Sequence, residues 1–399
     1  MSVLVAALAG LASPALALNA SDFAAKLGAS YDVFGSRLSY DTAVANGNTV
    51  TLGSVTQEVP GQPDLRLGDL TFEGVSETDD GGYTVRQLGY NDFTVTQPEA
   101  EISVSGLELN GIRIPGTTDG QRFDQVMSYE IARSGPISVK INGKDVFSIR
   151  AFESAMTQQP GNTGMNIVAK ANGVTIDLQA IDGAEGRRKM SLLGFDTLRG
   201  NLNLNMGWEF ETGRVQVRQY AFTIADLGRL NLKFDISGYT PDIIKAMQQA
   251  STAAASNPDP LAAQQATGIA MMEIMQQLTF NSGSIRFDDD SATSKALAYA
   301  GRKQGVSGEQ MAQAIKGLLP LALWRLNVPA LQQQISAAVN IYLDNPGNIT
   351  VSSNPGSPVA LPSIMGASMR ARMGDPGKLL ELLNVQITAN EPVELCCKE

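Results

Sequence analysis

The residue types that could carry out chemistry in this chain are few, and the most versatile of them is missing. The 399-residue sequence contains no histidine, so no Ser–His–Asp or Cys–His pair can form and no imidazole can bind zinc or haem. The glycine-rich patterns that bind nucleotide phosphates are also missing from the sequence. Ser–Lys and paired-carboxylate chemistry stay open in principle, but no local arrangement suggests either. We therefore expect no catalytic residue, no cofactor and no enzymatic activity.

Three consecutive carboxylates, Asp288–Asp290, are the candidate for a cation site. An oxygen cage needs ligands spaced around a loop with a turn-making glycine, and that spacing does not follow here. The alternative is that the three residues end a strand and cap a helix that begins near Ser291, where negative charge interacts favourably with the helix N-terminus. The pattern favours capping, and no metal site is predicted.

Aromatic side chains provide the candidate binding surface. Between Arg199 and Gly238 apolar and polar residues alternate with a period of two, which predicts three antiparallel strands with one apolar face. Burying a large aromatic side chain contributes about 1.5–3 kcal/mol, so other parts of the chain or a ligand must cover this face. The residues expected to contact an apolar ligand are Trp208, Phe210, Tyr220, Phe222, Phe234 and, from a separate segment, Trp324.

The segment Leu318–Leu326 is the most apolar stretch after the N-terminus. It could contact a membrane or line a lipid pocket. The alternative is a core segment that is kinked at Pro320 and packed under the sheet. The core alternative is the interpretation that we favour from the sequence.

The strands between Arg199 and Gly238 also have a predicted register. Thr212-Gly213 predicts a tight turn that places Trp208 opposite Val217. The apolar parity then changes, which predicts one extra residue, a β-bulge, at Arg218–Gln219.

Upstream of this block, from about Tyr31 to Gly200, the sequence is typical of short strands and turns. Asn-Gly is the strongest short signal for a hairpin turn. It occurs at Asn46-Gly47, Asn110-Gly111, Asn142-Gly143 and Asn172-Gly173. The pattern indicates a meander of successive hairpins.

Helical patterns dominate after Thr240. One helix is expected much earlier, near residues 18–30, with Ser21-Asp22 as its cap. Further helices are expected over about 240–252, 261–277, 292–301, 308–319, 328–343 and 377–383, with a hairpin at 278–287 and strands at 349–352 and 384–389. The predicted fold class is α+β. Residues 18–239 are expected to form a long twisted antiparallel β-meander sheet. Residues 240–399 are expected to form a mixed helical and β region whose helices pack against this sheet and complete the same fold.

The N-terminus and the charge indicate a compartment and exclude some partners. Residues 1–17 form an apolar run that ends in Ala15-Leu16-Ala17, which predicts a signal peptide. The basic residues that usually begin a signal peptide are missing. The alternative is a buried N-terminal helix. The net charge of −10 argues against nucleic acid and against a polybasic attachment to anionic lipid. No later stretch is long enough for a transmembrane span. Adjacent Cys396 and Cys397 cannot staple a core. We expect a periplasmic protein.

Several short motifs carry a family likeness. They are the turn Asp226-Leu227-Gly228, Phe287-Asp288 before a helix pair, Leu343-Asp344-Asn345-Pro346, and Asp375-Pro376 before Leu383. Over roughly residues 190–392 the chain resembles uncharacterised secreted proteins of Gram-negative bacteria and, more distantly, is similar to AsmA-like envelope proteins. The resemblance implies a long curved sheet, and it brings no catalytic residues to carry over.

Two functional hypotheses follow from these observations. The first is a non-enzymatic periplasmic envelope protein that holds a lipid or another apolar ligand on a curved sheet. The second is a structural or partner-binding envelope component with a filled core and no ligand. A hydrolase without histidine is the least favoured alternative.

Overall fold

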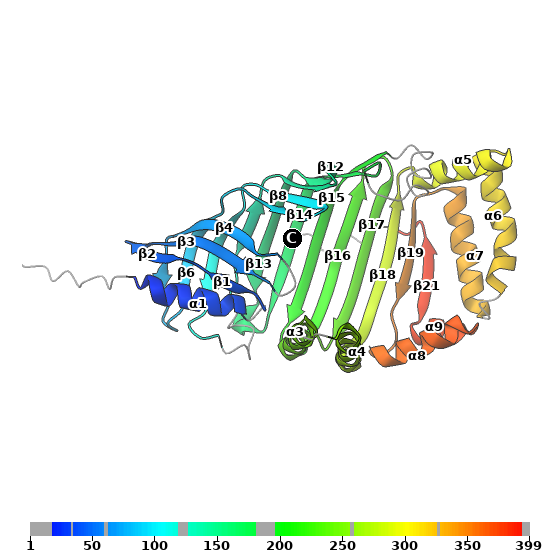
Figure 1. Ribbon diagram of the computed structural model, residues 1–399. Helices are drawn as coiled ribbons and strands as arrows, with labels where there is room; N and C mark the ends of the chain where they lie inside the picture. The colour runs from blue at the N-terminus through cyan, green and yellow to red at the C-terminus, as the bar shows by residue number, and fades with distance from the viewer. Residues whose placement is uncertain are drawn as a thin grey trace, which may run out of the picture.

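The computed structural model describes residues 18–32, 35–59, 63–118, 127–180, 196–255, 259–324 and 328–392. Most of these residues form one long antiparallel sheet, and the helices gather mainly toward the C-terminus (Figure 1). The predicted α+β class is confirmed. The expected signal peptide, residues 1–17, and both cysteines lie outside the described residues.

Strands that follow one another in the chain mostly pair with one another in the sheet. In spatial order the main strands are β3 (Thr49–Glu58), β4 (Leu65–Glu73), β6 (Tyr83–Gly89), β9 (Glu108–Ile114), β10 (Ile131–Ser134), β13 (Ala151–Gln158), β14 (Gly164–Asp177), β15 (Thr197–Glu209), β16 (Arg214–Ile224), β17 (Gly228–Ser237), β18 (Thr279–Asp289), β19 (Asn348–Ser353) and β21 (Val385–Ala389). The pairing of β17 with β18 joins the two predicted regions into one sheet.

Shorter strands complete the edges and form one branch. β1 (Arg37–Ser39) and β2 (Thr42–Asn46) both pair with β3, β5 (Ser76–Glu77) pairs with β6, and β20 (Val359–Ala360) pairs with β18. A branch of four strands joins the second half of β14 through β12; its members are β7 (Phe93–Thr96), β8 (Ala100–Val104), β11 (Ile137–Ile141) and β12 (Lys144–Ile149).

Two of the four Asn-Gly pairs form the predicted hairpin turns. Asn46 ends β2 and Gly47 begins the turn to β3, and Asn142-Gly143 lies between β11 and β12. The predictions for Asn110-Gly111 and Asn172-Gly173 are wrong, because these pairs lie inside β9 and β14. Their glycines have φ of +61° and +64°. A positive φ inside a strand produces an irregularity instead of a turn, and at Gly173 the partner of β14 changes from β13 to β12.

The register between β15 and β16 differs from the prediction by two residues. Trp208 lies opposite Val215, whereas the expected turn placed it opposite Val217. The loop between these strands contains four residues, 210–213, instead of two. A shift by two leaves every side chain on its predicted face. The bulge is confirmed, since Gln219 pairs with Asn205 but Val217 pairs with Met206.

The structure of β18 differs from the prediction for this segment. The predicted hairpin at 278–287 does not form, because Thr279–Asp289 is one continuous strand that pairs along its length with β17. Ser282-Gly283 is an irregular point in this strand near the register shift between Asp235 and Ile236. A glycine in a strand signals a turn or a bulge equally, and here the long partner strand keeps the backbone extended.

Most helices begin and end close to their predicted bounds. They are α1 (Ala20–Asp32), α3 (Pro241–Ala255), α4 (Pro260–Gln277), α5 (Ala292–Gln304), α6 (Gly308–Leu323), α7 (Pro329–Asp344), α8 (Leu361–Arg372) and α9 (Gly377–Leu382). The cap of α1 differs from the prediction: Asn19 Oδ1 accepts the Asp22 N–H at 3.1 Å. Helix α8 was not predicted.

The main core lies between α1 and the N-terminal half of the sheet. Phe23 is fully buried and meets Phe72 and Tyr83 edge to face, with ring centroids 5.0 and 5.2 Å apart. The Tyr83 hydroxyl donates to Asp22 Oδ2 at 2.6 Å, and Lys26 binds the same carboxylate oxygen. Apolar packing and this small polar cluster together fix α1 on the sheet.

The C-terminal helices cover less of the sheet than the sequence indicated. Figure 1 shows α3 and α4 at the lower ends of the strands and α5, α6 and α7 beyond the last strand. Helix α7 packs Ala338 and Tyr342 against Ile349, Ile387 and Ala389 of β19 and β21. The middle of β16, β17 and β18 has no helix in front of it (Figure 1). The helices of the region 240–399 therefore cover only part of the predicted apolar face: α3 packs Ile244 near Trp208, and α7 packs on β19 and β21.

Candidate functional site

One face of the sheet carries apolar side chains from strand to strand. Because paired residues of antiparallel strands point to the same side, the registers define two rows across β15, β16, β17, β18, β19 and β21. The first row is Leu204, Tyr220, Leu232, Ile285, Val351 and Ile387; the second is Leu202, Phe222, Leu230, Phe287, Ile349 and Ala389. This is the same side of the sheet that α1 covers in the N-terminal half, since the rows continue through Ala169 and Ala171 toward Leu109 and Leu88.

The central part of this surface is exposed. The exposed fractions are 41% for Tyr220, 39% for Leu230, 40% for Phe234, 53% for Ile285 and 39% for Val351. We call these five residues, together with half-buried Leu232, the open face. Large apolar side chains that gather on one surface mark a site of contact with a ligand or a partner, whereas isolated ones are common on any protein.

A cavity of about 320 Å³ lies on the open face between β17, β18, β19 and β21. Its apolar lining includes Leu232, Phe234, Phe280, Ile285, Val351 and Val385. Gly283 helps to form this hollow, because it lies opposite Phe234 and has no side chain. A Cβ at that position would lie 3.3 Å from the ring of Phe280. The cavity therefore combines an apolar lining with a shape that the sheet itself provides.

The structure separates the six residues that the sequence selected. Tyr220, Phe222 and Phe234 lie in or beside the open face. Trp208 is buried, and its Nε1–H donates to the Tyr239 carbonyl at 2.9 Å. Phe210 meets the Trp208 ring edge to face at 5.3 Å. These two rings form a small core with the start of α3.

The sixth residue, Trp324, lies at the end of α6 and is far more exposed than a core residue. Leu318 and Leu321 of the same helix are exposed as well. The preferred interpretation of Leu318–Leu326 as a core segment is therefore wrong for its described part, residues 318–324. Pro320 does not end the helix, which continues to Leu323.

Sequence reasoning did not select Leu230, Ile285 and Val351. Leu230 belongs to the predicted apolar face, but it is aliphatic, and the predicted ligand contacts are aromatic. Ile285 was assigned to a hairpin that does not form. The signal that would have found it is the alternation Ser284, Ile285, Arg286, Phe287 when read as one strand.

The opposite face of the same strands is polar and contains a buried ion pair. Asp235 of β17 is buried and accepts hydrogen bonds from Arg214 Nη2 at 2.7 Å and Asn281 Nδ2 at 2.8 Å. Burial raises the pKa of Asp235, but the hydrogen bonds from Arg214 and Asn281 outweigh burial and lower the pKa below its usual value. This cluster links β16, β17 and β18 from behind the open face.

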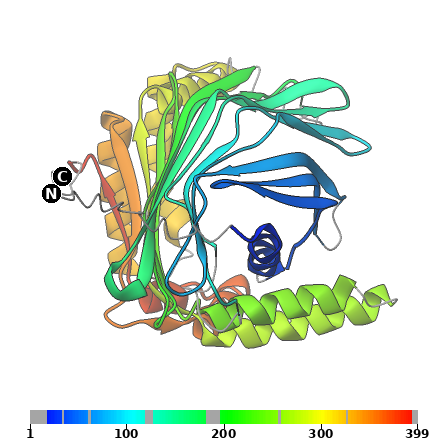
Figure 2. The same ribbon diagram turned by 90° about the vertical axis from the view of Figure 1, so that its left-hand side faces the viewer.

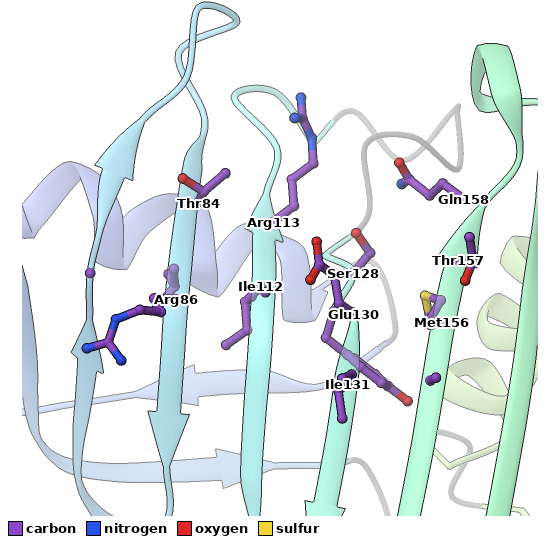
Figure 3. Close-up of a pocket in the computed structure, with 15 residues that line it drawn as sticks. Thr84, Arg86, Ile112, Arg113, Ser128, Glu130, Ile131, Met156, Thr157 and Gln158 are labelled. Carbon is purple, nitrogen blue, oxygen red and sulfur yellow. The ribbon is translucent and has the colours of Figure 1, made fainter.

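A second hollow, of about 710 Å³, lies in the N-terminal half of the sheet (Figure 3). Thr84, Arg86 and Arg113 contribute from neighbouring strands, and Ile112 and Met156 add apolar surface. Arg86 Nη2 lies 2.8 Å from Glu73 Oε2, and Arg113 Nη2 lies 2.7 Å from Asp80 Oδ2. Both guanidinium charges are therefore already compensated. The mixed lining does not select one class of ligand.

Of the three aspartates at the end of β18, Asp289 caps a helix as the sequence predicted, whereas Asp288 Oδ1 accepts a hydrogen bond from Arg286 Nε at 2.7 Å. Asp289 Oδ1 accepts the Thr293 N–H at 2.9 Å in the first turn of α5. Among the described residues, no group of three or more acidic or cysteine side chains is arranged to hold a metal ion. Capping therefore accounts for the position of Asp289.

Comparison with known proteins adds one match. A family model described as "Uncharacterized protein" matches residues 221–390, which extend from the end of β16 to the end of β21. Curated proteins give no match. The matched segment contains most of the open face and all helices after α1 that the structure describes.

Proposed function

We propose that this protein holds a lipid or another apolar molecule on the open face, without catalysing a reaction, as a component of the bacterial periplasm. The observation that carries the proposal is the row Tyr220, Leu232, Ile285 and Val351, which crosses four neighbouring strands and faces solvent. Each methylene group moved from water onto such a surface contributes about 0.8 kcal/mol. An acyl chain is therefore the class of ligand that fits this surface.

The open face is large enough for an extended chain. Strands in a sheet lie about 4.8 Å apart, so the four strands of the open face, β16 to β19, span about 14 Å. No polar side chain interrupts the first row across these strands. An apolar chain could lie across these four strands, next to the part of β21 on which α7 packs.

The surroundings of the open face also suit a ligand. Figure 2 shows the sheet curving around α1, with α3 and α4 extending from the lower edge on the same side. Helix α4 exposes further apolar side chains, including Leu261, Ile269 and Met272. Methionine adapts its shape to irregular apolar partners.

Two sequence features support the rest of the proposal. The absence of histidine removes the commonest acid–base and metal-binding group, and a holding function needs neither. The apolar run of residues 1–17 supports export.

Two valines provide a matched test. Val351 lies on the open face and Val168 lies on the opposite face, and their exposed fractions are 39% and 41%. Val351→Asp should weaken binding of a fluorescent fatty acid at least about tenfold, because the carboxylate must lose water when the chain binds. Val168→Asp should leave binding unchanged.

Thermal unfolding of both variants shows whether the fold is retained. Equal binding by wild type and both variants would contradict the proposed site. Failure of the wild-type protein to bind the fatty acid, together with absence of lipid in an organic extract, would contradict lipid holding and favour the partner-binding alternative.

A further inference from the structure

Arg218 extends from the bulge of β16 onto the polar face of the sheet, behind the open face. Its guanidinium donates to three side-chain amides: Nε to Gln216 Oε1 at 3.1 Å, and Nη1 to Asn166 Oδ1 and Asn205 Oδ1 at 3.4 Å each. These amides belong to β16, β14 and β15. Neutral side chains of three neighbouring strands therefore fix the position of this charge.

A glycine beside the guanidinium gives it room to lie close to the sheet. Gly207 of β15 pairs with Gln216. A Cβ at Gly207 would lie 2.9 Å from Arg218 Nη2 and 3.0 Å from Asn166 Oδ1. Any larger residue at this position would push the guanidinium away. The glycine and the amides together hold Arg218 in one place.

No carboxylate of the described residues neutralises this guanidinium. Arg218 is exposed and differs in this respect from five other arginines, which each contact an acidic side chain at 2.7 or 2.8 Å. These pairs are Arg86–Glu73, Arg113–Asp80, Arg133–Glu153, Arg214–Asp235 and Arg286–Asp288. A guanidinium has five N–H donors in a planar fork. The three amide contacts use Nε and Nη1 and leave Nη2 for another acceptor.

The groups next to Arg218 add donors to the same surface. Because arginine can only donate, the amide oxygens of Asn166 and Asn205 face it and their NH2 groups point away from it. Lys233 of β17 lies opposite the bulge, between the partners of Val217 and Tyr220. It is exposed and has no ion pair within the described ranges.

The acidic side chains of this region lie beside other arginines. Strands β13 to β17 contain six basic and four acidic residues. Glu153 bonds Arg133, Asp235 bonds Arg214, and Glu209 lies opposite Arg214 in the register. The fourth acidic residue, at position 177, ends β14. An anion at the bulge would therefore meet donors and positive charge.

We propose that Arg218, Lys233 and the amides of Asn166 and Asn205 bind a phosphate group. Arginine binds phosphate with its planar fork, and lysine adds a point charge. Phosphate presents three or more acceptor oxygens, which suits donors that come from several strands, whereas a carboxylate presents two. Free phosphate and a phosphate ester share this chemistry. The inference does not depend on the proposed function of the open face.

Calorimetric titration of the full chain with inorganic phosphate tests the site, with sodium chloride of equal ionic strength as the reference. We expect saturable binding that Arg218→Gln weakens at least about tenfold. Arg133→Gln should leave binding unchanged, because Glu153 already neutralises that arginine and it lies four strands away from β16. Absence of binding by the wild type, or equal binding by Arg218→Gln, would overturn the proposal.

A second variant tests whether the position of the guanidinium matters. Gly207→Ala removes no donor, but its methyl group displaces Arg218, so phosphate should bind at least about threefold more weakly. Unfolding curves show whether each variant folds. Unchanged binding by folded Gly207→Ala would contradict a site in which the sheet holds the guanidinium in place.

Glycerol phosphate distinguishes the two sources of the phosphate group. Binding as tight as that of inorganic phosphate, with the same loss in Arg218→Gln, would identify a phosphate ester as the ligand. Binding at least about tenfold weaker would identify free phosphate. Equal binding of glycerol phosphate by wild type and Arg218→Gln would place the ester at another site and contradict the proposal for esters.

Discussion

The apolar face of the sheet is buried in one half of the molecule and exposed to solvent in the other. Under α1, Val50, Phe72 and Tyr83 are at most 1% exposed. Between β16 and β19 the equivalent side chains form the open face. The alternation of residues is similar in both places. Burial therefore depends on whether a helix lies over the strands, and strand pattern does not reveal this.

This difference in burial also gives the apolar face a different role in each half of the molecule. In the α1 half, apolar surface is buried within the chain and stabilises the fold. In the open half, the same chemistry is available to another molecule, and the strands are held from behind by the Asp235 cluster. Substitutions on the same face should accordingly have different effects in the two halves.

The largest effect is expected under α1. Phe23→Ala removes a fully buried ring that contacts Phe72 and Tyr83, so the free energy of unfolding should fall by about 3–5 kcal/mol. Urea denaturation at neutral pH measures this loss. A loss below about 1 kcal/mol would show that α1 is not part of the main core.

An intermediate effect is expected behind the open face. Asp235→Ala leaves the Asn281 amide without its carboxylate partner, and the free energy of unfolding should fall by about 1–3 kcal/mol. The lowered pKa of Asp235 gives this contribution a pH dependence. It should be complete above the unfolded-state pKa of about 3.9 and disappear as the pH falls through the lower folded-state pKa.

Urea denaturation of wild type and Asp235→Ala at neutral pH and well below pH 4, past the lowered folded-state pKa, tests both statements. The two proteins should differ at neutral pH and approach each other in acid. A difference that grows in acid would contradict the pKa assignment.

The smallest effect on stability is expected on the open face itself. Phe234 is 40% exposed, so Phe234→Ala should lower the free energy of unfolding by less than about 1 kcal/mol. The same variant should bind a fluorescent fatty acid more weakly than wild type. A loss as large as that of Phe23→Ala, with unchanged fatty acid binding, would place Phe234 in a core and remove the contrast between the two halves.

Local features of the fold were predictable because their causes are local. The bulge at Arg218 follows from a change of apolar parity, and the structure confirms it. The capping box of Ser307 and Gln310 at the start of α6 depends only on spacing within one turn. The register of β15 against β16 was missed by two residues, since loop length is not fixed by Thr212-Gly213 alone. Asn-Gly at 110 and 172 was misread because a positive φ serves a bulge as well as a turn.

Only some residues of the open face can be predicted from the sequence. Tyr220, Phe222 and Phe234 were selected because strand alternation puts them on one side. Their exposure, and the contribution of Ile285 and Val351, depend on where α3 to α7 pack relative to strands far away in the sequence. Helix composition does not encode that position. Trp208 shows the converse, because α3 buries it while Tyr220 on the same face stays exposed.

The most direct test of a ligand on the open face is the mass of the folded protein. Protein purified without detergent should be weighed by native mass spectrometry and again after denaturation. The account predicts an additional mass in the native spectrum that matches one or more lipids, disappears on denaturation and is reduced in Val351→Asp but not in Val168→Asp. Identical native and denatured masses in repeated preparations would contradict it.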